Sequence, residues 1–202
     1  MSGTHSRHLD FLNASFQIEG SGQQITVVFR EEYHGQNELL RCLDMGKMGD
    51  IIVMNQGLHY LGEGRINMTQ EDLLNKYKAI QSRLLEALDR GIKLVWRETS
   101  AAHFNTSDGY ITDHIKQQQE QGNVSCVSSS IIESASSKNA SNGLLVPFMQ
   151  TLNISILETW EASYLLPEYC LAGRGIDCVH FLQPSGMTSY LTETLLNYIA
   201  KN

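Results

Sequence analysis

Asp50-Ile51-Ile52-Val53-Met54 consists of one carboxylate and the four apolar residues that follow it. The turn residues Asn55-Gln56-Gly57 end this run. A run of this length, bounded by turn residues, is typical of a strand buried on both faces. A long helical pattern starts at the capping-box sequence Thr69-Gln70-Glu71-Asp72, and Gly91 ends it. Further β-branched or apolar strand patterns lie at 24–30, 92–96 and 154–157. Buried strands that alternate with helices predict an α/β fold with a parallel sheet covered on both faces.

The remaining segments fit the same architecture. Spacing and composition predict helices over 5–15, 38–44, 108–121, 144–152 and 185–200, a short strand over 124–127, and a loop with one helical turn over 159–169. Residues 128–142 are rich in Ser, Ala and Asn, and we expect them to form a flexible, exposed insertion. At 202 residues the chain is long enough for a single domain over 1–202.

Composition excludes several classes of partner. The formal net charge is −7 and no basic stripe occurs, so we expect no nucleic-acid partner. No apolar run approaches the roughly 18 residues of a membrane span, so we expect no membrane contact from this segment itself. No two cysteines have C-x-x-C spacing, which argues against a zinc site. Cys170 and Cys178 flank a Gly-rich turn and could bridge in an oxidising compartment, but four cysteines allow three pairings and the sequence does not choose among them.

Six Asn-x-Ser/Thr sequons occur, more than the roughly two that this composition would give by chance. They begin at Asn13, Asn67, Asn105, Asn123, Asn139 and Asn153. Sequons act only in a secretory lumen, yet residues 1–7 resemble neither a signal nor a transit peptide. One explanation is that the chain belongs to a longer, membrane-anchored luminal protein. The other is that Ser- and Asn-rich loops generate sequons by chance.

Polar side chains follow two of the predicted strands directly. Asn55-Gln56-Gly57-Leu58-His59-Tyr60 follows the 50–54 strand, and Arg97 to Phe104 follows the 92–96 strand. Sites in parallel sheets gather at the carboxyl ends of the strands, so we expect these residues to share one edge. The histidines there are expected to be hydrogen-bonding pocket residues rather than metal ligands. Trp96 is expected in the core, with stacking on a sugar ring as the alternative.

Asp177-Cys178-Val179-His180-Phe181 pairs a carboxylate with an imidazole three residues later. An Asp at this spacing can hold the Nδ1 of the imidazole and leave Nε2 free to act as a base. The alternative is a surface Asp and a structural His, because such pairs are frequent by chance.

Three segments together resemble a known family. Residues 50–60, 96–104 and 177–181 are similar, in this order, to the D-x-x-x-x-N-x-G-x-H/W, F-R-T-x-S-x-x-H-F and D-C-x-H-W segments of the PC-esterase branch of the SGNH/GDSL hydrolases. Trichome-birefringence-like polysaccharide O-acetyltransferases belong to that branch. The resemblance implies a three-layer, flavodoxin-like α/β fold and a Ser-His-Asp triad, with Asp177 and His180 as two of its members.

The nucleophile block of that family, G-D-S-x-x-R, has no clear counterpart. Its nearest match is Ser2-Gly3-Thr4-His5-Ser6-Arg7, which places Thr4 at the nucleophile and Ser6 as a second hydroxyl. The β-methyl of a threonine is a steric burden at a tight turn. The strand that should precede this block is missing apart from Met1, so either the first strand lies outside this chain or the nucleophile lies elsewhere.

The resemblance implies an O-acyl (acetyl) transferase or esterase acting on a carbohydrate in the Golgi lumen. Thr4 or Ser6 would attack, His180 would take the proton, and Asp177 would orient His180. Asn55 and the Gly57 backbone would bind the oxyanion, and the pocket residues are expected to be His59, Arg97 and His103. No cofactor or metal is expected, although acetyl-CoA is a conceivable acyl donor. The rival expectation is a catalytically inactive domain, or a fragment of a larger protein, that binds glycan without turnover.

Overall fold

The computed structural model describes residues 13–17, 24–28, 36–55, 69–101, 103–104, 117, 121, 126, 140–165, 178 and 186–201. The chain divides into two compact units, Met1–Cys42 and Leu43–Asn202. Helix α1 (Asn37–Met45) runs across this boundary and confirms the helix expected over 38–44.

The first unit contains an antiparallel hairpin. Strands β1 (Asn13–Gln17) and β2 (Gln24–Val28) pair in a register that places Phe16 opposite Ile25 and Gln17 opposite Gln24. The helix expected over 5–15 is wrong where it can be checked, because residues 13–15 are extended. Apolar Ala14 and Phe16 alternate with polar neighbours, which is the period of a strand. The strand expected over 24–30 is confirmed, but it pairs with β1 and does not belong to the parallel sheet.

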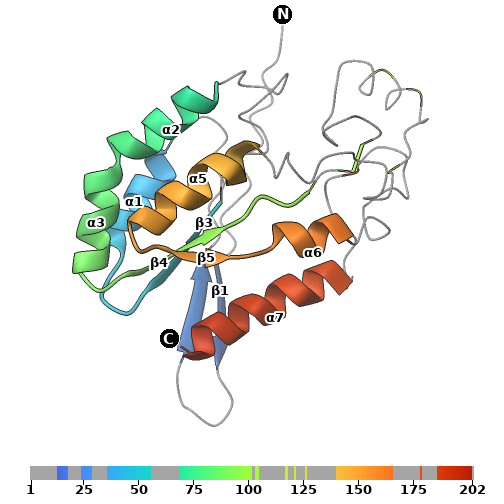
Figure 1. The fold of residues 1–202 in the computed structure, drawn as a ribbon. Coiled ribbons are helices and arrows are strands. Elements are labelled where there is room, and N and C mark those ends of the chain that lie inside the picture. The colour runs from blue at the N-terminus through green and yellow to red at the C-terminus, as the bar shows by residue number, and fades with distance from the viewer. Residues whose placement is uncertain are drawn as a thin grey trace, which may run out of the picture. The chain divides into compact units, whose positions relative to one another are not determined.

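The second unit contains the parallel sheet that the sequence predicts. Strands β3 (Ile51–Met54), β4 (Lys93–Arg97) and β5 (Ser155–Leu157) lie in the order β3-β4-β5, and both pairings are parallel (Figure 1). The strands expected over 50–54, 92–96 and 154–157 are confirmed. The protein is therefore an α/β protein with a small parallel sheet.

Five further helices are described in this unit: α2 (Gln70–Ala79), α3 (Gln81–Asp89), α5 (Ala140–Thr151), α6 (Trp160–Leu165) and α7 (Gly186–Lys201). The sequence predicts one helix where α2 and α3 stand. Ile80 separates them because it leaves the helical region (φ −104°, ψ 8°) and donates to Tyr77 O in a tighter turn (3.2 Å). Helix α5 begins within the predicted 128–142 insertion, most of which lies outside the described residues. So do most of the predicted helix over 108–121 and of the strand over 124–127.

Local signals at both ends of the α2–α3 segment are confirmed. Thr69 Oγ1 accepts from Asp72 N (3.0 Å), and the Asp72 carboxylate accepts from Thr69 N (3.2 Å). Gly91 follows α3 with φ +79°, a conformation that side-chain-bearing residues rarely adopt. Gly49, with φ +90°, donates to Gly91 O (3.0 Å). This bond joins the turn before β3 to the turn before β4.

The core lies between the sheet and its helices. Trp96 is fully buried, and its ring meets that of Tyr77 on α2 edge-on, with centroids 5.4 Å apart, which confirms its expected place in the core. Trp96 pairs with Ile156 on β5, so both side chains lie on the α2 face. Ser155 lies on the other face, where it accepts a hydrogen bond from Tyr198 of α7 (3.0 Å). The sheet therefore carries helices on both faces.

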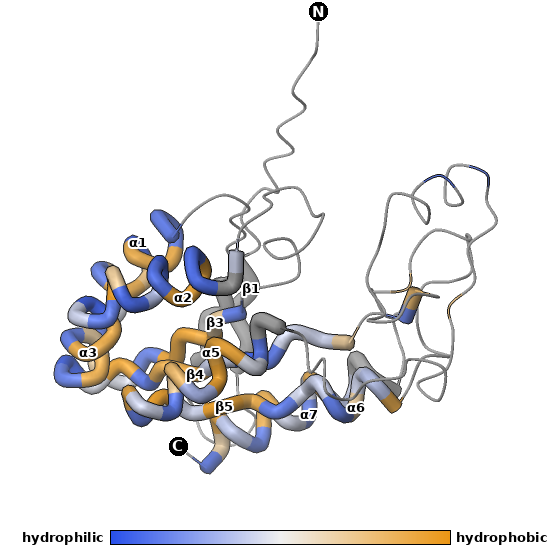
Figure 2. The backbone as a smooth tube through the Cα atoms, turned by 45° about the horizontal axis from the view of Figure 1, so that its top comes forward, coloured by the Kyte–Doolittle hydropathy of each residue, from blue (hydrophilic) through white to orange (hydrophobic). Residues whose placement is uncertain are grey.

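The hydropathy of the helices matches these positions. Along α3 the tube alternates between blue and orange, whereas α5 is largely orange (Figure 2). Leu84 and Ala87 form the buried stripe of α3, and Leu145 and Met149 are the fully buried side chains of α5. Within the described residues, no helix combines the length and the apolar character that crossing a membrane requires.

Candidate functional site

Three of the nine predicted site residues lie in the described part of the chain: Asn55, Arg97 and His103. The other six, Thr4, Ser6, Gly57, His59, Asp177 and His180, lie outside it. Asn55 directly follows β3 and Arg97 ends β4, at the carboxyl ends of adjacent parallel strands. The structure thus brings together the two residues that follow the first two core strands, as the sequence predicts.

Asn55 and Arg97 form a reciprocal pair. Arg97 Nη2 donates to Asn55 Oδ1 (3.1 Å), and Asn55 Nδ2 donates to the main-chain carbonyl of Arg97 (2.9 Å). The same Nδ2 also donates to Thr99 Oγ1 (3.0 Å). Both amide hydrogens of Asn55 are therefore engaged within the protein, and donation to an oxyanion would require one of these bonds to break. The geometry favours Asn55 as a positioning residue for Arg97.

Arg97 is a cation without a matching carboxylate in the described part of the chain. The ion pairs found there are made by Arg41 and Arg83. The guanidinium of Arg97 donates to Asn55 and, more weakly, to Ser100 Oγ (3.4 Å), and both of these partners are neutral. Burial lowers the pKa of Arg97, because the charged form loses solvation. Arginine nevertheless stays protonated at neutral pH, so the edge of the sheet carries a poorly solvated positive charge.

Glu98, the residue after Arg97, is committed to the fold. Its side chain is buried, and Oε2 accepts from the backbone N–H groups of Thr159 and Trp160 at 2.9 Å each. This carboxylate thereby accepts from two backbone N–H groups at the start of α6 that have no acceptor within the helix. Thr159 Oγ1 in turn donates to Glu98 O (2.9 Å). Glu98 is not available to neutralise a ligand.

The loop after Glu98 is held by an amide from α5. Thr99 N donates to Asn142 Oδ1 (2.8 Å), and Asn142 Nδ2 donates to Thr99 O (2.9 Å). Both residues are buried. The Asn142 amide thus bonds both backbone groups of Thr99, as a neighbouring strand would, and fixes the main chain between Arg97 and Ser100. Asn142 is not among the residues predicted from sequence, because it falls in the stretch predicted to be an exposed insertion.

His103 lies below the surface rather than on it. It is fully buried, and its Nε2 lies 2.8 Å from Ser163 O on α6. A carbonyl oxygen only accepts, so Nε2 carries the proton. Ser163 Oγ also accepts from Ala101 N (2.8 Å). This arrangement favours a structural role for His103, in contrast to the pocket role expected from sequence.

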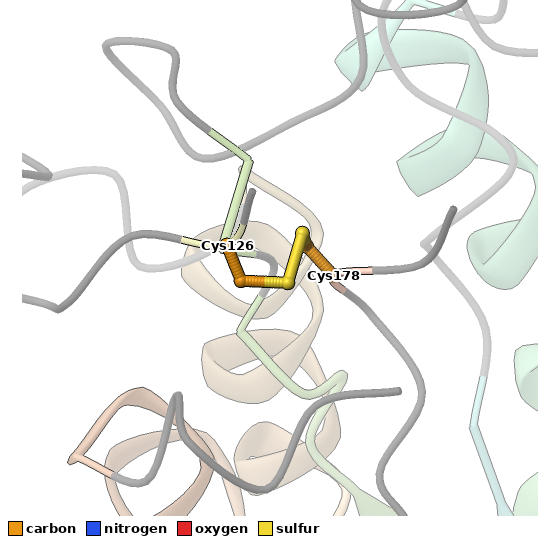
Figure 3. Close-up of a disulfide and its surroundings, with 2 residues drawn as sticks. All are labelled: Cys126 and Cys178. Atoms are coloured by element: carbon orange, nitrogen blue, oxygen red, sulfur yellow. A yellow bond between two sulfur atoms is a disulfide. The ribbon is translucent and has the colours of Figure 1, made fainter. Parts of the chain in front are cut away.

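The His103 main chain reaches the Asp177–Phe181 segment. His103 N donates to Cys178 O (2.8 Å), so the residue between Asp177 and Val179 lies at the loop that follows β4. Cys178 is buried and forms a disulfide with Cys126, with Cα atoms 5.3 Å apart (Figure 3). A bridge between Cys170 and Cys178, one of the possibilities that the sequence leaves open, is therefore excluded. Proximity along the chain suggested Cys170, whereas the folded chain brings Cys126 to the buried sulfur.

A metal centre and a surface hollow are two other kinds of site that the described residues could form. No group of three His, Cys, Asp or Glu side chains in the described ranges is arranged to hold a metal ion. A hollow of about 320 Å³ lies between the last turn of α1 and helix α3, and Arg97 is not among the residues that line it. Its lining consists of Leu43, Asp44, Arg83, Glu86, Asp89 and Arg90. Arg83 pairs there with Asp44 and Glu86, so its charges are already matched.

No protein-family model matches this chain, and no match was found among curated proteins or among solved structures. The likeness to PC-esterases therefore rests on the three sequence segments alone. The structure adds two contacts between these segments. Asn55 is hydrogen-bonded to Arg97 at the carboxyl ends of β3 and β4, and His103, in the loop that follows β4, is hydrogen-bonded to Cys178.

Proposed function

We propose that this protein is an SGNH-type domain that acts on O-acyl groups, chiefly acetyl groups, of carbohydrate. The observation that carries the proposal is the hydrogen bond from His103 N to Cys178 O. It joins the loop after β4 to the residue that stands between Asp177 and His180 in the sequence. The reciprocal Asn55–Arg97 pair supports the proposal, because it ties the first motif to the second at the carboxyl ends of β3 and β4.

In the proposed reaction the hydroxyl oxygen of Thr4 or Ser6 attacks the acyl carbonyl. The hydroxyl proton passes to His180, and Asp177 stabilises the imidazolium that forms. Collapse of the tetrahedral intermediate breaks the bond to the leaving alcohol, which takes that proton from His180. Water or a sugar hydroxyl then attacks the carbonyl of the acyl-enzyme and gives its proton to His180; the ester bond to Thr4 or Ser6 breaks, and that oxygen takes the proton back from His180. The same triad therefore serves an esterase or a transferase, depending on water exclusion.

A secretory-lumen location, in the Golgi, is part of the proposal. The Cys126–Cys178 disulfide supports it, because disulfides persist in oxidising compartments and are rare in the cytosol. The six sequons support it independently.

Acetyl release from a chromogenic ester tests the proposal. Wild-type protein is compared with Thr4→Ala, Ser6→Ala and His180→Ala variants of matched thermal stability. Loss of the base should reduce the rate by about a thousandfold or more. Activity that persists in His180→Ala would refute the triad, and activity that survives in both hydroxyl variants would refute the assigned nucleophiles.

A glycan-binding domain without turnover is the second candidate. The engaged amide of Asn55 favours it, because the side chain expected to bind an oxyanion already spends both hydrogens on Arg97 O and Thr99 Oγ1. Glycan binding without ester cleavage, unchanged in His180→Ala, would support this candidate over the enzyme.

A further inference from the structure

The geometry points to Arg97 as an anion-binding residue, and we propose that the carbohydrate ligand carries a carboxylate or sulfate group that this guanidinium binds. The anion site stands on the contacts of Arg97. That the anion is attached to a carbohydrate rests on the proposed function.

The donors of Arg97 are held in place but not used up. A guanidinium has five N–H donors in a planar fork. Two groups are directed at described acceptors, Nη2 at Asn55 Oδ1 and Nη1 at Ser100 Oγ. Asn55 is itself fixed by its bonds to Arg97 O and Thr99 Oγ1, so the guanidinium is supported from its own strand and from β3. The remaining donors can meet two oxygens of a carboxylate or a sulfate.

The electrostatics favour a ligand anion. Arg97 is only partly exposed, and burial lowers its pKa, which indicates a cation that has lost solvation. A charge in this position is stabilised by an opposite charge more strongly than an exposed one is. The neighbouring carboxylate of Glu98 cannot supply it, because Oε2 is bound by Thr159 N and Trp160 N. An incoming anion would meet neutral polar groups around the guanidinium, from Asn55, Thr99 and Ser100.

The position fits substrate recognition. Arg97 ends β4, at the edge where ligands of parallel sheets bind. It is also within six residues of His103, whose main chain contacts Cys178. A charge-assisted contact here would orient a sugar relative to the acyl group without taking part in bond breaking.

Equilibrium binding of matched oligosaccharides tests the inference. Trigalacturonate is compared with its methyl ester, and a sulfated galactan oligosaccharide with its desulfated form, by isothermal titration of the wild-type protein. At low salt we expect at least one acid to bind about tenfold more tightly than its neutral match, because a hydrogen bond between two charged groups is stronger than one to a neutral acceptor. Which pair shows the preference identifies carboxylate or sulfate as the anion.

Variants assign the preference to Arg97. Arg97→Gln should bind acid and neutral forms equally, and Arg97→Lys should retain only part of the preference, because lysine lacks the fork. Arg83→Gln is the matched control, because Arg83 already pairs with Asp44 and Glu86. Should Arg97→Gln fail to fold, Asn55→Asp places a carboxylate against Nη2 and should also suppress the preference.

The inference is overturned if the wild type binds acid and neutral forms equally or binds neither, or if the preference survives in Arg97→Gln. These outcomes are separate from ester cleavage. A protein that cleaves a chromogenic ester but shows no preference for acids would retain the proposed function and lose this inference. A protein that prefers acids but cleaves no ester would retain the anion site at Arg97 and lose the proposed enzymatic function.

Discussion

The main-chain N–H of His103 donates to the main-chain carbonyl of Cys178, at 2.8 Å. Because both partners are backbone groups, the contact does not depend on the identity of either side chain. Both residues are buried, and an unsatisfied buried backbone group is costly, so this contact restrains the loop after β4 and the Cys178 segment together. Substitutions that loosen either segment should affect both.

Removing the Cys126–Cys178 disulfide should destabilise the protein. The bridge closes a loop with a sequence separation of 52 residues. A loop of this length corresponds to about 4 kcal/mol in the chain-entropy model, and disulfides typically contribute about 2–4 kcal/mol. The Cys126→Ser/Cys178→Ser double variant should therefore unfold at lower urea concentration, and reductant should shift the wild type in the same direction. Cys42→Ser, outside this bridge, is the control, and an equal shift there would contradict the prediction.

His103→Ala should act on stability rather than on substrate. The imidazole is fully buried and bonded to Ser163 O, so its removal should cost about 2–4 kcal/mol of the free energy of unfolding. Ester cleavage per folded molecule, if the protein cleaves esters, should stay near the wild-type rate. A fall in rate at unchanged stability would instead assign His103 to the pocket. Ser163→Ala, which keeps the carbonyl acceptor, should cost less.

Acid should weaken the start of α2. A hydrogen bond from the Thr69 hydroxyl, and then one from its backbone N–H, lower the pKa of Asp72. Because the folded pKa is depressed, the stabilisation is present above the ordinary Asp value of about 3.9 and is lost as pH falls through the lowered value. Urea midpoints at pH 5 and below pH 4 should therefore differ less in Asp72→Asn than in wild type. A difference in Asp72→Asn as large as that of the wild type would contradict the prediction.

Gly91→Ala should destabilise more than Gly49→Ala. Both residues have positive φ, so each substitution introduces backbone strain of about 1 kcal/mol or more. A Cβ on Gly91 would in addition lie 2.8 Å from Met48 Cγ, whereas one on Gly49 meets no atom within 4 Å. Thermal denaturation should rank the variants in that order. Adding Met48→Ala to Gly91→Ala should remove the steric clash, so the remaining loss of stability should equal that of Gly49→Ala, which comes from backbone strain alone.

Asn153 should carry an N-linked glycan when the protein is made in a secretory cell. It is exposed in the turn between α5 and β5, and its φ of +56° is one that Asn tolerates well. Asn153→Gly should remove one glycan, seen by mass spectrometry before and after enzymatic deglycosylation, without loss of stability. An unmodified Asn153 beside glycosylated sequons elsewhere would contradict the prediction.

Strands and most helix boundaries could be predicted because local pattern decides them. The apolar runs ending at Met54, Trp96 and Leu157 form the sheet, and Thr69 and Asp72 form the expected cap. The first strand of the hairpin at 13–28 is not predicted. The helical spacing of Leu9, Leu12 and Phe16 favours a helix, whereas the alternation of apolar and polar residues over 13–17 favours a strand. Cross-strand pairing decides that competition, and it is not local.

The candidate site could be predicted only in outline. Strand ends bring Asn55 and Arg97 to one edge, and strand order predicts this. The bonds of His103 to Ser163 O and of Asn55 to Arg97 O depend on how loops and helices pack, which no spacing encodes. The pairing of Cys126 with Cys178 depends on the same packing and on chain closure.

Arg97 and Glu98 are adjacent in the sequence but differ in their surroundings. The Glu98 carboxylate is buried at the start of α6, whereas the Arg97 guanidinium lies at the carboxyl edge of the sheet, against Asn55. Total charge is therefore a poor guide to what this molecule attracts. A chain with a formal charge of −7 can still present a local spot of positive potential, because the counter-charge one residue away has been turned inward. Exchanging the two side chains would leave the composition unchanged and invert the sign of that spot.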